Sequence, residues 1–168
     1  MKLDPQRTFR YYYLKFIRLK GEPVELARGV GLGLFIGVTP TIPLHTLLVL
    51  FTTLISRSSK ITGLLASVVI SNPLTIPPTY YFSWKLGTWF TGTHISWAYI
   101  RSVMNLVLSD AGFMERISAV LHLGREALVT LLLGGFILAL PIGLAGYFLS
   151  YLFFDAIKRK RNQKHVLR

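Results

Sequence analysis

The sequence predicts an all-α integral membrane protein with two proline-broken helical segments, and three observations predict this class. First, 52% of the 168 residues are hydrophobic. Second, residues 29–56, 61–84 and 127–154 contain no Asp, Glu, Lys or Arg, and these windows hold 28, 24 and 28 residues. A membrane-spanning helix needs about 20 mainly apolar residues. Third, prolines stand in the middle of the first two windows.

Residues 1–22 are predicted to form a basic amphipathic helix. Over Gln6–Lys20, aromatic and aliphatic residues recur at helical spacing, and Arg and Lys fall on the opposite face. This pattern is typical of a helix that lies in the headgroup plane of a membrane. Packing of the aromatic face against the rest of the protein is an open alternative. Pro23 then suits the first turn of the following helix.

The first broken segment covers residues 29–56. Its apolar arms, Gly29–Val38 and Leu44–Ile55, flank a break at Thr39–Pro43. Glycines at every fourth position of the first arm favour close helix packing in lipid.

The second broken segment covers residues 61–90, with a break at Ser71–Pro78 between the arms Ile61–Ile70 and Thr79–Phe90. Thr-Ile-Pro occurs in both breaks, which is a weak internal repeat. Each arm is about half a bilayer long at 1.5 Å per residue. Irregular backbone at membrane depth is tolerated only where protein buries it or water lines it. We therefore expect re-entrant or discontinuous helices that meet at a central site; two kinked spanning helices without a site are the alternative.

The remaining chain completes a single membrane domain over residues 23–154. Residues 91–126 are predicted to form an amphipathic connector of two helices, separated near Ser109–Gly112, that lie at the membrane interface or cover the broken segments. Residues 127–154 are the cleanest transmembrane candidate, with Pro141 and several glycines inside. Residues 155–168 form a basic tail that we expect to be cytoplasmic.

The net charge of +12 is concentrated near the two ends of the chain. Because the basic residues flank charge-free windows, the positive-inside rule explains them better than nucleic-acid binding does. The rule places both termini in the cytoplasm, which requires an even number of crossings. Three plain spans would give an odd number, so the number of crossings stays open.

Polar and aromatic residues in and beside the breaks are the candidate binding site. They are Thr41, Pro43, His45, Asn72, Pro73, Thr75, Pro77, Tyr80 and Tyr81, with Arg28 and Lys85 at the ends of the charge-free stretches. His45 either binds a ligand or pairs with a freed carbonyl. Asn72 either serves the site or caps the next turn. Arg28 and Lys85 either snorkel to headgroups or bind an anionic ligand.

Conventional catalytic and metal-binding patterns are not found in the sequence. There is no cysteine, no paired-carboxylate motif and no phosphate-binding glycine loop, and the four histidines lack ligand spacing. We therefore predict no catalytic residue, no metal and no cofactor. An intramembrane enzyme that uses His45 is the least favoured alternative.

Three motifs resemble those of a bacterial membrane family called domain of unknown function 2062. They are G-x-F-x-G at Gly33–Gly37, P-x-x-x-x-H-T at Pro40–Thr46 and S-N-P-x-T-x-P-P-x-Y-Y at Ser71–Tyr81. The resemblance implies a small inner-membrane protein of Gram-negative bacteria. Some members are joined to glycosyltransferase domains, which implies a link to lipid-linked sugar metabolism.

The leading functional hypothesis is transport or flipping of a lipid headgroup or small anionic solute at the proline-lined site. The alternative is a non-catalytic membrane anchor, scaffold or regulator of an envelope enzyme. The expected partners are membrane lipids with anionic headgroups. A second copy of the chain and an envelope enzyme stay open as protein partners.

Overall fold

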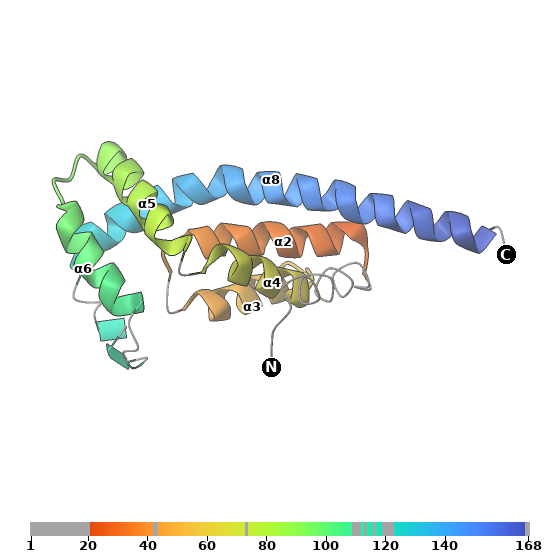
Figure 1. The fold of residues 1–168 in the computed structure, drawn as a ribbon, viewed down its shortest axis with the longest axis horizontal. Helices are drawn as coiled ribbons and strands as arrows, with labels where there is room; N and C mark the ends of the chain where they lie inside the picture. The colour runs from red at the N-terminus through yellow and green to blue at the C-terminus, as the bar shows by residue number, and fades with distance from the viewer. Residues whose placement is uncertain are drawn as a thin grey trace, which may run out of the picture.

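The computed structural model is helical throughout the residues that it describes (Figure 1). These are residues 21–41, 44–72, 74–108, 112, 114–115, 117–118 and 123–166. Within them lie helices α2 (Pro23–Val38), α3 (His45–Ile55), α4 (Lys60–Ile70), α5 (Ile76–Thr91), α6 (Trp97–Leu108) and α8 (Arg125–Val166). The all-α prediction is confirmed. The helix expected over Gln6–Lys20 and most of the second interfacial helix lie outside the described residues.

Helix α8 is the longest helix, and α2 and α5 pack along it (Figure 1). It has 42 residues and contains Pro141. Its segment Arg125–Arg161 is long and apolar enough to cross a membrane, by length and composition. The helix continues to Val166, so the described part of the predicted basic tail is helical.

Helix α2 runs antiparallel to α8. At one end, Lys158 of α8 forms an ion pair with Glu22, the residue before α2. At the other end, the rings of Phe35 and Phe136 meet edge to face with centroids 5.3 Å apart. The described N-terminal and C-terminal ends of the chain therefore lie at the same end of the bundle.

Helix α4 runs parallel to α2 and packs closely against it. Gly29 faces Thr62, and Gly37 faces Ile70. Between them, Gly33 faces the backbone of Gly63, where neither helix has a Cβ to keep the chains apart. The Thr62 hydroxyl crosses to the carbonyl oxygen of Leu26 at 3.0 Å. The four-residue glycine spacing thus produces the close contact that such spacing favours.

The two interrupted segments take different paths. Helix α3 folds back along α2 and α4, because Val49 and Thr53 face Gly63, and the Ser59 amide donates to the Glu25 carbonyl oxygen at 3.1 Å. Helix α5 continues away from α2 and crosses the N-terminal half of α8, where Ser83 faces Gly134.

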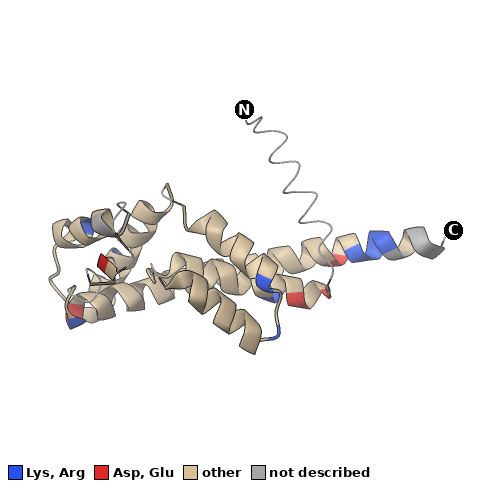
Figure 2. Ribbon diagram, turned by 90° about the horizontal axis from the view of Figure 1, so that it is seen from below, with Lys and Arg blue, Asp and Glu red and all other residues tan. Residues whose placement is uncertain are grey.

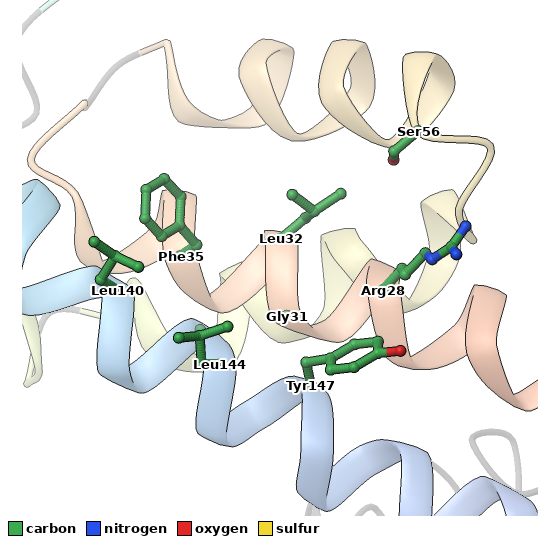
Figure 3. A pocket seen from close by; sticks show the side chains of 9 residues that line it. Arg28, Gly31, Leu32, Phe35, Ser56, Leu140, Leu144 and Tyr147 are labelled. Atoms are coloured by element: carbon green, nitrogen blue, oxygen red, sulfur yellow. The ribbon is translucent and has the colours of Figure 1, made fainter.

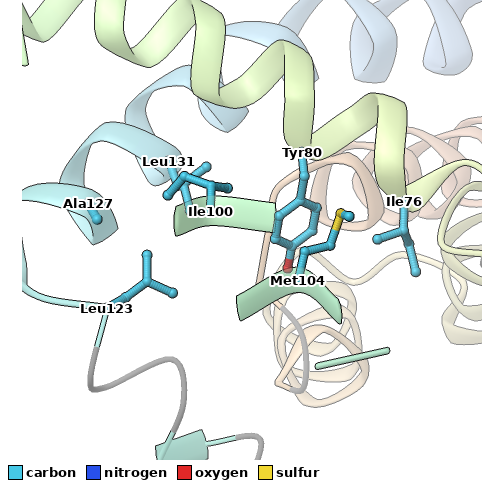
Figure 4. Packing of buried hydrophobic residues seen from close by; sticks show 7 residues of the cluster. All are labelled: Ile76, Tyr80, Ile100, Met104, Leu123, Ala127 and Leu131. Atoms are coloured by element: carbon cyan, nitrogen blue, oxygen red, sulfur yellow. The ribbon is translucent and has the colours of Figure 1, made fainter. Parts of the chain in front are cut away.

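Helix α6 covers the junction of α5 and the start of α8. The cluster that joins them is apolar apart from the Tyr80 hydroxyl (Figure 4). It contains Ile76, Tyr80, Ile100, Met104, Leu123, Ala127 and Leu131. This cluster is the buried apolar core at the end of the bundle opposite the described termini.

Charged residues gather towards the two ends of the bundle, and the middle is free of them (Figure 2). Among the described residues, the end that holds the described termini carries more cations than anions. Its cations are Arg28, Arg57, Lys60, Lys158, Arg159, Lys160 and Arg161, and its anions are Glu22, Glu25 and Asp155. A central apolar belt between two charged layers is the distribution that a bilayer requires of an inserted protein.

We predict that Gly33→Ala destabilises the bundle by about 1–3 kcal/mol, because the added methyl would clash with the carbonyl oxygen of Gly63. The matched control is Gly112→Ala, since nothing lies within 4 Å of a Cβ at Gly112. Thermal unfolding in detergent should show a lower midpoint for the first variant only. Equal midpoints for both variants would contradict the close packing of α2 on α4.

Candidate functional site

The two interruptions of the helices lie side by side. Helix α2 ends at Val38 and α4 ends at Ile70. The hydroxyl of Ser71 donates to the carbonyl oxygen of Gly37 at 2.9 Å, which joins positions 34 residues apart. The C-terminal ends of two parallel helices therefore meet, as the recurrence of Thr-Ile-Pro in both breaks led us to expect.

Threonines close the first interruption. The amide and the hydroxyl of Thr39 both donate to the Phe35 carbonyl oxygen, at 3.2 and 2.9 Å. The Thr41 hydroxyl is 3.3 Å from the Thr39 carbonyl oxygen, and the Thr41 carbonyl accepts the Leu44 amide at 2.7 Å. Pro40 packs against Gly135 of α8. Pro43, which belongs to the predicted site, lies outside the described residues.

Asn72 closes the second interruption. Its Oδ1 accepts the amides of Leu74 and Thr75 at 2.9 and 3.1 Å, and its Nδ2 donates to the Val69 carbonyl oxygen at 3.0 Å. The Thr75 hydroxyl donates to the Ile70 carbonyl oxygen and also accepts the Asn72 amide. Asn72 thus fills the capping role that was one of its two predicted roles. Pro73 is not among the described residues.

The second interruption is shorter than the predicted break at Ser71–Pro78. Helix α5 begins at Ile76, so Pro77 and Pro78 lie in its first turn. Proline is tolerated there because the first amides of a helix have no partner within the helix. The three prolines within residues 73–78 therefore mark where α5 begins as well as where α4 has ended.

His45 begins α3 and carries an unpaired polar atom. Its Nε2 lies 3.3 Å from the Thr46 hydroxyl. Its Nδ1 is buried and has no hydrogen-bond partner among the residues that the structure describes. The predicted bond to a freed carbonyl is therefore not formed by Nδ1. A buried polar atom of this kind calls for a partner, because desolvation without a hydrogen bond costs about 1–3 kcal/mol.

Tyr80, Tyr81 and Lys85 lie along α5 rather than between the interruptions. Tyr80 is buried beside Met104 of α6 (Figure 4). The ring of Tyr81 meets that of Trp97 edge to face, with centroids 5.2 Å apart. Lys85 is exposed further along the helix. The structure therefore brings Thr41, Asn72 and Thr75 to one region of two touching helix ends, and turns both tyrosines towards α6.

Arg28 stands at a separate groove between α2 and α8 (Figure 3). The groove has a volume of about 410 Å³. Its lining is apolar apart from groups at one end, and comprises Arg28, Gly31, Leu32, Phe35, Ser56, Leu140, Gly143, Leu144 and Tyr147. Arg28 is the one predicted site residue in this lining. Gly31 and Gly143 are the residues in the sequence that could have indicated this groove. Only the fold shows that they lie opposite each other.

Comparison with known proteins gives one match. A family model described as an uncharacterized protein conserved in bacteria, DUF2062, covers residues 6–163. The chain belongs to this family. The family resemblance that the three motifs indicated is therefore confirmed. Searches of curated proteins and of solved structures give no match.

In this DUF2062 protein, we predict that Asn72→Ala lowers the free energy of unfolding by about 1–2 kcal/mol, because two amides and one carbonyl lose their side-chain partners. Asn72→Asp keeps the acceptor oxygen and should recover part of that loss. Asn105→Ala, at an exposed position of α6, is the control. Chemical denaturation in detergent measures all three, and an unaltered Asn72→Ala midpoint would refute the capping role.

Proposed function

We propose that this DUF2062 protein is an inner-membrane protein with two full crossings and one re-entrant hairpin. Helices α2 and α3 form the hairpin, α4 and α5 form one discontinuous crossing, and α8 forms the other. The apolar belt between two charged layers supports this assignment, as does the length of α8. The first interruption packs through Pro40 on Gly135 of α8, and side-chain hydrogen bonds pair backbone groups at both interruptions, as irregular backbone at membrane depth requires.

The same arrangement reconciles the basic ends of the chain with the number of crossings. The hairpin does not cross, so two crossings return the chain to the side from which it started. The ion pair between Glu22 and Lys158 holds the start of α2 and the end of α8 together at one end. Because that end is rich in Lys and Arg, we assign it to the cytoplasm.

We further propose that the meeting point of the interruptions handles an anionic lipid headgroup or a small anionic solute during transport or flipping. The observation that carries this proposal is the unpaired Nδ1 of His45, which begins the helix that follows the first interruption. The contact of Pro40 with Gly135 of α8 gives the depth of this region in the membrane. Gly135 lies about 8 Å along α8 from the middle of its charge-free stretch, at 1.5 Å per residue. Polar groups at such depth are costly and commonly functional.

A specific observation also favours the second candidate, a membrane anchor or scaffold for an envelope enzyme. The side chains of Thr39, Asn72 and Thr75 all pair with local backbone groups. These bonds satisfy the freed backbone without any ligand. On this alternative the interruptions shape the protein, and the partner binds elsewhere.

We predict that reporter fusions at both termini indicate the cytoplasm. An even number of crossings and the cationic end of the bundle both require this result. Activity of a cytoplasmic reporter at one terminus together with a periplasmic reporter at the other would contradict the two-crossing topology.

Reconstitution tests the transport proposal. Proteoliposomes that contain a fluorescent phosphatidylglycerol should show transfer of the probe between leaflets, measured as the fraction that an impermeant quencher reaches. His45→Ala should remove most of this transfer, whereas Asn105→Ala should retain it. Transfer no faster than in protein-free vesicles would reject flipping of this lipid and favour the scaffold alternative.

The His45 variant also separates a site from a structural role. If Nδ1 of His45 takes part in binding, its removal should abolish transfer while the unfolding midpoint stays within a few degrees of the wild type. A parallel loss of transfer and of stability would assign His45 to folding alone.

A further inference from the structure

We propose that the groove between α2 and α8 binds one phospholipid with an anionic headgroup. The phosphate would lie at Arg28, and an acyl chain would run over the two glycines towards Phe35. This inference rests on the proposed membrane insertion, but not on a site at the interruptions. Lipid binding at this groove therefore can be tested without a transport assay.

The shape of the groove fits a hydrocarbon chain. Gly31 of α2 and Gly143 of α8 face each other and form a floor without side chains. Phe35, Leu140 and Leu144 form the walls (Figure 3). From Arg28 to Phe35 the groove is about 10 Å long at 1.5 Å per residue, which accommodates roughly the first eight carbons of an extended chain.

The charge at the mouth of the groove fits a phosphate. Arg28 is exposed and has no ion-pair partner among the described residues. Of the acidic residues described at this end, Glu22 and Asp155 are paired with cations of α8, and Glu25 forms no ion pair with Arg28. A guanidinium presents several donors in a plane and binds phosphate oxygens in pairs. Arg28 is therefore free to bind an anion that the protein itself does not supply.

The depth of Arg28 fits the boundary between headgroups and acyl chains. Gly31 lies between Gly143 and Tyr147 of α8, and Arg28 precedes Gly31 by three residues on the antiparallel α2, so Arg28 lies at the level of Phe148. That level is about 11 Å from the middle of the charge-free stretch of α8 at 1.5 Å per residue. The hydrocarbon core of a bilayer is about 30 Å thick, so a snorkelling arginine at this depth reaches the phosphate layer.

A lipid fits better than a free phosphate ion, because the groove offers few other polar groups. The Ser56 hydroxyl already donates to the Thr52 carbonyl oxygen at 2.7 Å and pairs with Ser58 at 2.8 Å. The Tyr147 hydroxyl points to the end of the groove that Arg28 occupies (Figure 3). A bare anion would have one arginine and one phenol, whereas a lipid also buries its chain against the apolar walls.

Native mass spectrometry of the full chain in detergent tests the inference with phosphatidylglycerol, phosphatidylethanolamine and inorganic phosphate as probes. The wild type should retain phosphatidylglycerol in preference to phosphatidylethanolamine. Arg28→Gln should weaken the binding of phosphatidylglycerol about fivefold through loss of the charge-assisted hydrogen bonds. Leu144→Trp should weaken both lipids, since the indole would fill the groove. Excess inorganic phosphate should not displace the lipid.

Matched controls separate this groove from general lipid contact. Arg161→Gln removes a cation from the same end outside the groove, and Leu149→Trp changes an exposed position of α8 outside the lining. Both should bind lipid as the wild type does. Equal binding by Arg28→Gln and Arg161→Gln, or displacement by inorganic phosphate, would overturn the inference. Alkaline carbonate extraction, which reports insertion alone, distinguishes this failure from failure of the membrane assignment.

Discussion

The pairing of backbone groups at the two interruptions is the constraint on which the rest of the structure depends. Where a helix ends away from water, its amides and carbonyls need partners within the protein. Here the hydroxyl of Ser71 donates to a carbonyl oxygen of α2, and the side chain of Asn72 accepts an amide of its own interruption. The pairing requires α2 and α4 to approach closely, and the glycines of α2 allow that approach. The interruptions and the glycine packing therefore depend on each other.

Much of the fold could be predicted from the sequence, because apolar runs and prolines are local signals. The ends of the first break agree with the end of α2 at Val38 and the start of α3 at His45. The start of α5 was placed too late, since Pro77 is compatible with a first helical turn. That α3 folds back while α5 continues depends on contacts such as Val49 with Gly63, and no local pattern encodes them.

The candidate site was less predictable, because it depends on which surfaces meet. The recurrence of Thr-Ile-Pro led us to place the interruptions together, and Ser71 on Gly37 joins them. Tyr80 and Tyr81 follow the prolines in sequence, yet helical geometry turns them towards α6. The groove at Arg28 needs Gly143, which lies more than a hundred residues away in the chain. The spacing of residues in one sequence predicts neither the direction in which the two tyrosines point nor a contact between residues so far apart in the chain.

The re-entrant path of α2 and α3 is the central claim, and the side of the membrane that holds the turn after α3 tests it most directly. This chain has no natural cysteine, so Arg57→Cys and His94→Cys each introduce a single label site. Both positions are exposed, one after α3 and the other after α5. An impermeant maleimide should label Arg57→Cys only from the cytoplasmic side and His94→Cys only from the opposite side. Labelling of Arg57→Cys from the side opposite the cytoplasm would contradict the hairpin.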